Sequence, residues 1–182
     1  MTTGYLIKDQ RSTYFVTFTV VEWLDLFSRQ VYRDTLIGAL LFCIREKGLL
    51  VYRYVIMTNH MHLIIGCTGR VPLSDIIRDF KQYTAKQCLE VVKSNKESRR
   101  DWLLQRFQYQ ASLRQRGSQY QLWTHENHAI EIFSRSFFEQ KSKYIHLNPV
   151  KAGWVDLPED YVYSSAYELS GRGNKLPIAK WV

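Results

Sequence analysis

Residues 49–66 read LLVYRYVIMTNHMHLIIG, two apolar runs separated by the short segment Thr58-Asn59-His60. Both runs are rich in β-branched and aromatic residues, which favour strands, and each has the length of one strand. Two strands joined by so short a connection pair in antiparallel fashion. This stretch therefore predicts an antiparallel β-hairpin, and the neighbouring segments can be placed around it.

The sequence before the hairpin predicts a strand followed by a helix. Residues 13–23 read TYFVTFTVVEW, which is again rich in β-branched and aromatic residues and predicts a strand. From Val31 to Lys47 the apolar residues recur at helical spacing, and Gly48 follows as a helix stop.

The sequence after the hairpin is predominantly helical in pattern. One helix is predicted from Leu73 to about Lys93, where the polar run KSNKESRR interrupts it. A second helical stretch continues to about Arg116 and ends at Gly117-Ser118. Further along we expect short strands or extended segments at Gln119–Trp123 and Ala129–Phe133, and a helix at Arg135–Leu147 that must end by Pro149.

This order of elements predicts an α+β fold. We expect a ferredoxin-like split βαβ arrangement, with an antiparallel sheet of about four to five strands and helices packed on one face of it. The C-terminal tail from about residue 154 is expected to be irregular and to carry little chemistry. A chain of 182 residues has the length of one domain, so we expect a single domain over residues 1–182.

The composition excludes several classes of protein. A hydrophobic fraction of 46% and an aromatic fraction of 14% are too high for a disordered chain. The longest apolar run, Leu36–Ile44, is far shorter than the roughly 20 residues that span a bilayer, so no membrane partner is expected. The first residues lack the apolar core of a signal peptide, and three cysteines without CxxC spacing fit reduced thiols. We therefore expect a protein that stays inside the cell.

Positive charge is concentrated in one part of the chain. There are 25 Lys and Arg against 17 Asp and Glu, a net charge of +8, and ten basic against four acidic residues lie between Arg78 and Arg116. Basic side chains neutralise phosphates and exposed aromatic rings stack on unpaired bases, so this stretch indicates a nucleic-acid surface. The alternative is a solvated pair of amphipathic helices with buried aromatic residues. The residues expected to contact DNA are Arg78, Lys81, Lys86, Arg99, Arg100 and Arg106.

Two short motifs carry candidate chemistry. His60 and His62 are two apart on a predicted strand, so both imidazoles point to one face and suit a divalent ion whose other positions stay open. The alternative is a pair of partly buried, hydrogen-bonded histidines without a metal. Tyr144 and Asn148 are four apart, which places a phenol and an amide on one helical face, provided that Asn148, which precedes Pro149, still belongs to the last turn.

Four segments together resemble a known family. HMHLII at residues 60–65, WTHENHAI at 123–130, YIHLNPVKAGWV at 144–155 and PEDYVYSSA at 158–166 resemble the REP-associated tyrosine transposases, part of the single-tyrosine HUH transposase superfamily. The histidine pair alone is unspecific, whereas the tyrosine helix and the segments after it are highly specific in this order. The resemblance spans nearly the whole chain and implies a single HUH transposase domain with a basic helical insertion at about residues 93–118.

The resemblance also implies a role for individual residues. His60, His62 and Asn148 would hold Mg²⁺ or Mn²⁺, and Tyr144 would be the nucleophile. His128, which matches a histidine of the family's motif before the last helix, and His146 are candidates for an acid/base or supporting role. An unperturbed imidazole accepts a proton near neutral pH.

The implied function is that of a DNA transposase and endonuclease. It would cleave and rejoin single-stranded DNA next to hairpin (REP, palindromic) sequences through a covalent 5′-phosphotyrosine, in the bacterial cytoplasm on nucleoid DNA, as a monomer or a homodimer. Three alternatives stay open: a non-catalytic module that binds hairpin DNA or RNA, a metal-dependent nuclease in which water attacks and Tyr144 is structural, and an insertion-sequence transposase that acts on its own element ends.

Overall fold

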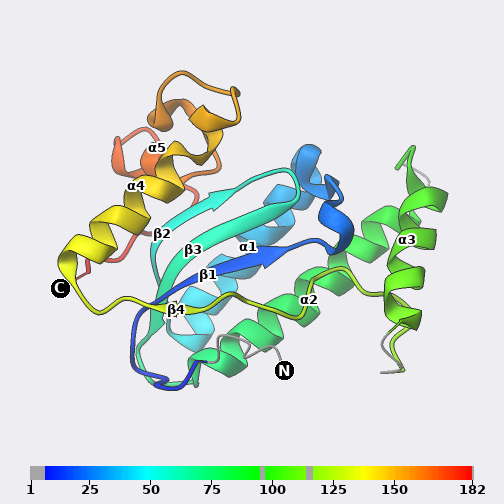
Figure 1. Cartoon of the computed structure of the whole chain (residues 1–182), viewed down its shortest axis with the longest axis horizontal. Helices are drawn as coiled ribbons and strands as arrows, with labels where there is room; N and C mark the ends of the chain where they lie inside the picture. The colour runs from blue at the N-terminus through cyan, green and yellow to red at the C-terminus, as the bar shows by residue number, and fades with distance from the viewer. Residues whose placement is uncertain (1–6, 95–96, 114–116, 182) are drawn as a thin grey trace.

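The computed structural model describes residues 7–94, 97–113 and 117–181, and over these residues it has an α+β fold built on one antiparallel sheet (Figure 1). The predicted hairpin is confirmed, and its second strand begins at His60. The spatial order of the strands is β2-β3-β1-β4. The strands are β1 (Tyr14–Thr19), β2 (Leu49–Ile56), β3 (His60–Cys67) and β4 (Ile130–Glu131).

Helices connect and cover these strands. The turn from the first helix into β2 uses Gly48 at φ +75°, and a Cβ at that position would clash with the Thr68 side chain. Among the described residues no helix is long and apolar enough to cross a bilayer. The helices are α1 (Gln30–Lys47), α2 (Leu73–Lys93), α3 (Arg100–Ser112), α4 (Arg135–Lys151) and α5 (Ser165–Leu169), with short 3₁₀ turns η1 (Val21–Trp23), η2 (Leu26–Ser28) and η3 (Pro158–Asp160).

The helices cover both faces of the sheet, so the expectation that all of them lie on one face is wrong. Phe18 of β1 packs against Phe80 of α2, whereas Phe15 packs against Tyr144 of α4. Residues separated by an odd number along a strand point to opposite faces, so α2 and α4 lie on opposite sides of β1. The physical reason is visible in β3, whose residues 61–66 are all buried and therefore need cover on both faces.

Several predicted boundaries differ from the structure. The first strand ends at Thr19 and not at Trp23, because η1 follows, with Glu22 and Trp23 at φ 54° and 56°. Of the two segments expected to be short strands or extended, 119–123 has one bridge, between Trp123 and Val20, and 129–133 contains the two-residue strand β4. The helix expected to reach Arg116 ends at Ser112, and residues 114–116 lie outside the described part of the chain.

Helix α4 does not end before Pro149 but continues to Lys151. A proline within the last turn removes one intrahelical hydrogen bond, and the burial of its ring offsets part of that loss. The Ala152 N–H still donates to the Asn148 carbonyl at 3.1 Å. Asn148 therefore remains helical, one turn beyond Tyr144.

The tail beyond residue 154 is largely irregular, as expected, and it packs against β2 through α5 and the residues around it. Ser164 caps the N-terminus of α5 and forms a bridge with Val55. The Ser165 hydroxyl accepts a hydrogen bond from the Tyr54 N–H at 3.0 Å. Near the C-terminus, Trp181 stacks on Phe138 of α4 with a ring separation of 4.6 Å.

Candidate active site

Strand β3 presents His60 and His62 on the same face, as their spacing predicts. The centroids of the two imidazole rings are 4.7 Å apart. His62 is buried and its ring lies 5.1 Å from that of Tyr144, so the face that carries the histidine pair is the face covered by α4.

The neighbouring strand β1 holds the ring of His62 from the other side. The antiparallel register pairs Thr17 with His62, and the Thr17 Oγ1 lies 2.8 Å from His62 Nδ1. Phe15 stacks on the His62 ring with a centroid distance of 5.4 Å. Sequence reasoning missed Thr17, although the register of β1 against β3 would have found it. Because Nδ1 is used by the hydroxyl, Nε2 is the nitrogen of His62 left for a ligand.

His60 is oriented in a comparable way by the residue before it. Its Nδ1 lies 2.6 Å from Asn59 Oδ1, and the Asn59 amide nitrogen donates to the Trp23 carbonyl at 3.1 Å. The second bond fixes which end of the amide faces His60, so Asn59 Oδ1 accepts and His60 Nδ1 carries the proton. The lone pair of His60 therefore lies on Nε2, as a metal ligand requires.

Both histidines are neutral at pH 7. Burial lowers the pKa of His62 to about 3, with smaller contributions from the neighbouring His60 and Lys141, and burial also lowers the pKa of His60. A histidine must be unprotonated to bind a metal. The lowered pKa values keep both imidazoles unprotonated at pH 7, so that each can bind a cation.

Tyr144 stands at the open side of this pair. Its hydroxyl lies 3.5 Å from His62 Nε2, beyond the usual length of a hydrogen bond between oxygen and nitrogen, and the residue is 42% exposed. Asn148 is half-buried one helical turn later on the same face of α4. One strand and one helix thus bring the two histidines and the phenol together, with the Asn148 residue one helical turn beyond the phenol.

The donor set of this cluster fits a divalent cation. Among the described residues there is no group of three or more His, Cys, Asp or Glu side chains placed to hold a metal, so any site here depends on the amide of Asn148 as well as His60 and His62. Two imidazole nitrogens and one amide oxygen suit Mn²⁺ better than Mg²⁺, which prefers an all-oxygen set. Such a set leaves positions open for water and for substrate oxygens.

Two lysines stand over the rings of the cluster. The Lys141 ammonium lies 4.7 Å from the ring centre of Phe15 and 5.9 Å from that of Tyr144. Lys151 lies 5.9 Å from the Tyr144 ring. These cations are close enough to attract a phosphate brought to the phenol.

The other two histidines proposed from the sequence, His146 and His128, each contact a polar side chain. His146 is two residues after Tyr144 and so projects from a different side of α4, where its Nε2 lies 2.8 Å from Ser165 Oγ. Burial lowers its pKa to about 4, with a contribution from Arg53. His128 has φ 42° and its Nε2 lies 3.6 Å from a carboxylate oxygen of Glu126. The Ser165 contact of His146 therefore lies on a different side of α4 from the phenol.

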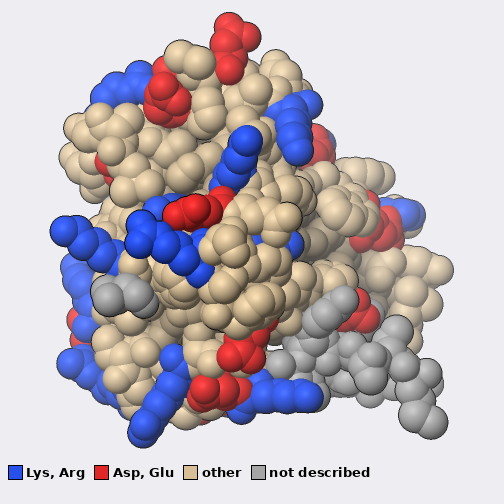
Figure 2. Space-filling view, turned by 60° about the vertical axis from the view of Figure 1, so that its left-hand side comes forward, with Lys and Arg blue, Asp and Glu red and all other residues tan. Residues whose placement is uncertain are grey.

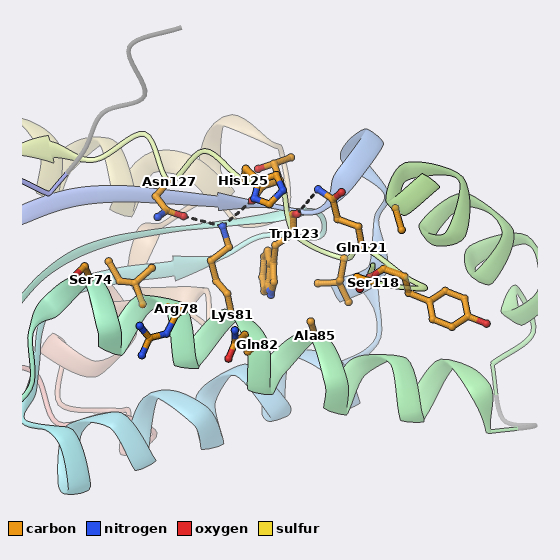
Figure 3. A pocket seen from close by; sticks show the side chains of 15 residues that line it. Ser74, Arg78, Lys81, Gln82, Ala85, Ser118, Gln121, Trp123, His125 and Asn127 are labelled. Carbon is orange, nitrogen blue, oxygen red and sulfur yellow. Dashed lines mark hydrogen bonds between the residues drawn. The ribbon is translucent and has the colours of Figure 1, made fainter. Parts of the chain in front are cut away.

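Two of the predicted DNA contacts line a cavity of about 530 Å³ between α2 and the segment 118–127 (Figure 3). Lys81 donates to the Thr124 carbonyl at 2.7 Å and to Asn127 Oδ1 at 2.8 Å, and burial lowers the pKa of its ammonium to about 8. Arg78 forms ion pairs with Asp75 and Asp79. The structure does not bring these two residues to the histidine pair.

The remaining predicted contacts lie on α2, α3 and the loop before α3, and most of them have acidic neighbours. Arg99 pairs with Asp25 at 2.8 Å, Arg100 lies 3.9 Å from Asp101, and Arg106 pairs with Glu22. Lys86 is exposed on α2. In Figure 1, α3 lies at the opposite end of the molecule from α4. On the face shown in Figure 2, Lys and Arg gather toward the left and lower edges with Asp and Glu between them.

A tyrosine held over a histidine pair on an antiparallel sheet defines a class of proteins, the single-tyrosine transposases. The chain belongs to the IS200-like transposase family, whose model matches residues 11–148. Its fold is shared by a solved structure of a REP-associated tyrosine transposase bound to a REP hairpin, with 21% sequence identity, a TM-score of 0.59, and 94% of this chain and 85% of that chain covered. Together they support the resemblance seen in the sequence. A comparison with curated proteins found no match.

Removing the hydroxyl of Thr17 should weaken metal binding through His62. In Thr17→Val the imidazole loses the partner that sets its orientation, so we expect roughly 10- to 100-fold weaker Mn²⁺ binding. Titration with Mn²⁺, followed by electron paramagnetic resonance of the free ion, measures this. Thr17→Ser keeps the hydroxyl and should bind like wild type. Equal affinities for the valine and serine variants would contradict the assignment.

The half-buried His146 should make stability depend on pH. Its pKa of about 4 lies below the unfolded value near 6.5, so between these values the unfolded chain binds more protons and stability falls as pH falls. Between pH 7 and pH 5 the loss from this residue should be about 2 kcal/mol. Urea unfolding with a chelator present should show a smaller pH dependence for His146→Gln than for wild type. An unchanged dependence would contradict the prediction.

Proposed function

We propose that this chain is a single-tyrosine DNA transposase that cleaves and rejoins single-stranded DNA next to hairpin (REP, palindromic) sequences through a covalent 5′-phosphotyrosine. The observation that carries the proposal is the position of the Tyr144 phenol, 3.5 Å from a nitrogen of His62 and open to solvent. Membership of the IS200-like transposase family supports a DNA-cleaving activity.

In this proposal each residue of the cluster has one task. His60, His62 and Asn148 would hold Mg²⁺ or Mn²⁺, which when bound polarises the scissile phosphate and stabilises charge on its oxygens. Thr17 and Asn59 hold the two imidazoles in the orientation that leaves each Nε2 free.

Tyr144 performs the covalent step. Its oxygen forms a bond to phosphorus as the phenol loses its proton, and the bond from phosphorus to the 3′-oxygen breaks. The departing 3′-oxygen takes up a proton and the 5′-phosphate stays on the enzyme. Attack of a different 3′-hydroxyl on the phosphotyrosine reverses these events and completes strand transfer, with no external source of energy because one phosphodiester replaces another.

The partner proposed for this site is single-stranded DNA beside a hairpin. The solved structure with the same fold was determined with a REP hairpin, which supports this class of ligand. We place the hairpin against the basic residues of α2 and α3, including Lys86 and Arg100. We also propose that residues 1–182 form one catalytic domain in which about 93–118 is a basic insertion, as a monomer or homodimer.

A gel assay tests the proposed function. Labelled single-stranded DNA that carries a hairpin and an unpaired flank is incubated with the protein and Mn²⁺, and the products are separated in SDS. We expect a labelled band that migrates with the protein and disappears after protease treatment. Binding of several hairpins without cleavage or adduct would favour the alternative of a non-catalytic binding module.

A further inference from the structure

A row of aromatic rings, joined at one point by a lysine, runs through the candidate active site and beyond it on both sides. Trp23 lies 5.7 Å from the ring of His60, which leads to His62 and then to Tyr144. On the other side, Lys141 lies over Phe15 and over Phe137, and Phe137 stacks on Phe133 at 5.1 Å. Each step in the row is between 4.7 and 5.9 Å.

The two ends of this row are the most exposed large aromatic side chains among the described residues. Trp23 is 63% exposed and Phe133 is 79% exposed. Aromatic side chains usually stabilise a protein by being buried. Because these two rings are left largely in water, packing in the hydrophobic core does not account for their presence. Phe133 stacks one face on Phe137, with an angle of 20° between the rings.

The backbone that carries Trp23 is strained and is held in place by other elements. Glu22 and Trp23 have φ values of 54° and 56°, which side-chain-bearing residues rarely adopt. The Glu22 carboxylate accepts hydrogen bonds from Arg106 and Gln110 of α3, and the Trp23 carbonyl accepts one from Asn59. Strain of this kind persists where surrounding contacts impose it, and it concentrates at functional sites.

The other arm of the row is a stripe along one side of α4. Phe137 and Lys141 are four apart, and Tyr144 follows on the same side of the helix, while Phe133, just before the helix, stacks on Phe137. Cations stand within the stripe, because Lys141 lies near the rings of Phe137 and Tyr144, and also near Phe15 of β1, and Lys151 lies beside Tyr144. Aromatic faces alternating with cations are the composition that binds unpaired bases and their phosphates.

We propose that this row is a binding track for the single strand that is to be cut, with the scissile phosphate over Tyr144, an unpaired base on one side of it stacked on Trp23, and an unpaired base on the other side stacked on Phe133. The inference rests on the proposed function and extends it, because it assigns the positions of the flanking nucleotides. It also gives Arg106 a positioning task, since its pairing with Glu22 holds the loop that presents Trp23.

Fluorescence of 2-aminopurine tests the track without the chemistry. The base analogue is placed at one unpaired position at a time in the hairpin DNA, and binding is measured in a Tyr144→Phe background. We expect quenching at one position that is lost in Trp23→Ala, and quenching at a second position, across the scissile bond, that is lost in Phe133→Ala. Each substitution should weaken binding about tenfold, and Trp23→Tyr should restore the first position.

Phe42→Ala is the matched control, because Phe42 is a 50% exposed aromatic residue on α1 and outside the row. It should leave binding and quenching unchanged. Thermal unfolding of each variant checks that it is folded. If Trp23→Ala disturbs the loop beside His60, Phe133→Ala still tests the proposal, because Phe133 contacts neither histidine in the row.

Two results would overturn the track. In the first, both alanine variants show the same quenching and the same DNA affinity as the parent protein, and wild type still forms the covalent adduct. This result refutes the track but not the proposed function. In the second, Phe133→Ala changes the oligomeric state in size-exclusion chromatography and leaves DNA binding unchanged. This result would make the surface around Phe133 an interface between copies of the chain. Absence of any adduct with wild type refutes the proposed function itself.

Discussion

Tyr144→Phe is expected to abolish the covalent protein–DNA adduct while leaving the fold and hairpin binding intact. The substitution removes only the oxygen that would bond to phosphorus, and the ring contacts with His62 and Phe15 are preserved. Removing a nucleophile of this kind lowers turnover by roughly 10³-fold or more. The measurement is the amount of labelled DNA that stays with the protein in SDS, with cleavage products quantified in the same gel.

The same variant separates two mechanisms. A nuclease that activates water would continue to cut after Tyr144→Phe, because its nucleophile does not come from the protein. Continued cleavage without adduct would therefore contradict the covalent mechanism. Tyr83→Phe is the matched control, since Tyr83 is a 54% exposed tyrosine on α2, on the opposite face of the sheet. Loss of the Tyr83 hydroxyl should change neither the amount of adduct nor the amount of cleaved DNA.

His62→Ala is expected to cause the second large loss. The residue contacts Tyr144, is held by Thr17 and stacks on Phe15, so no neighbouring side chain replaces its nitrogen. We expect Mn²⁺ binding and cleavage to fall by roughly 10²-fold or more, and removal of the metal from wild type with a chelator to have the same effect on cleavage. Calorimetric titration with Mn²⁺ and the adduct assay measure the two quantities.

The control for this variant is another histidine outside the cluster. His125 is exposed and lines the cavity beside α2, so His125→Ala should bind Mn²⁺ and form adduct as wild type does. Because His62 is buried, its replacement also leaves a cavity, and the melting temperature must be measured alongside. Full metal affinity in a folded His62→Ala variant would exclude His62 as a ligand.

The hairpin and the helices were predictable because their signals are local. The apolar runs around residues 58–60, the helical spacing of 31–47 and the stop at Gly48 all act within one element. The same holds for the common face of His60 and His62, since strand geometry alone places residues two apart on one side. Their proximity in the structure, 4.7 Å between ring centres, follows from that geometry.

The boundaries that failed depend on packing. The periodicity of the last helix does not reveal that Pro149 is buried and that the helix continues past it to Lys151. Composition left open whether 119–123 is a short strand or an extended segment, and the structure gives it one bridge, to Val20, because composition alone does not make a ladder.

The basic residues show that a local count of charges does not reveal their ion pairs with distant residues. A count of Lys and Arg between residues 78 and 116 says nothing of acidic partners that are distant in sequence. Arg106 meets Glu22 and Arg99 meets Asp25, more than 70 residues away in each case. Their role as DNA contacts is therefore a proposal that must compete with ion pairs within the protein.

By itself, the sequence determined the α+β class, the central hairpin, and the pairs His60–His62 and Tyr144–Asn148, because each depends on spacing within one strand or helix. Only the tertiary structure decided that α4 crosses the face carrying the histidines, that Thr17 and Asn59 hold the two imidazole rings, and that Trp23 lies against His60 and Phe133 against Phe137. These features join residues far apart in the chain, and only long-range strand register and packing bring such residues within contact distance.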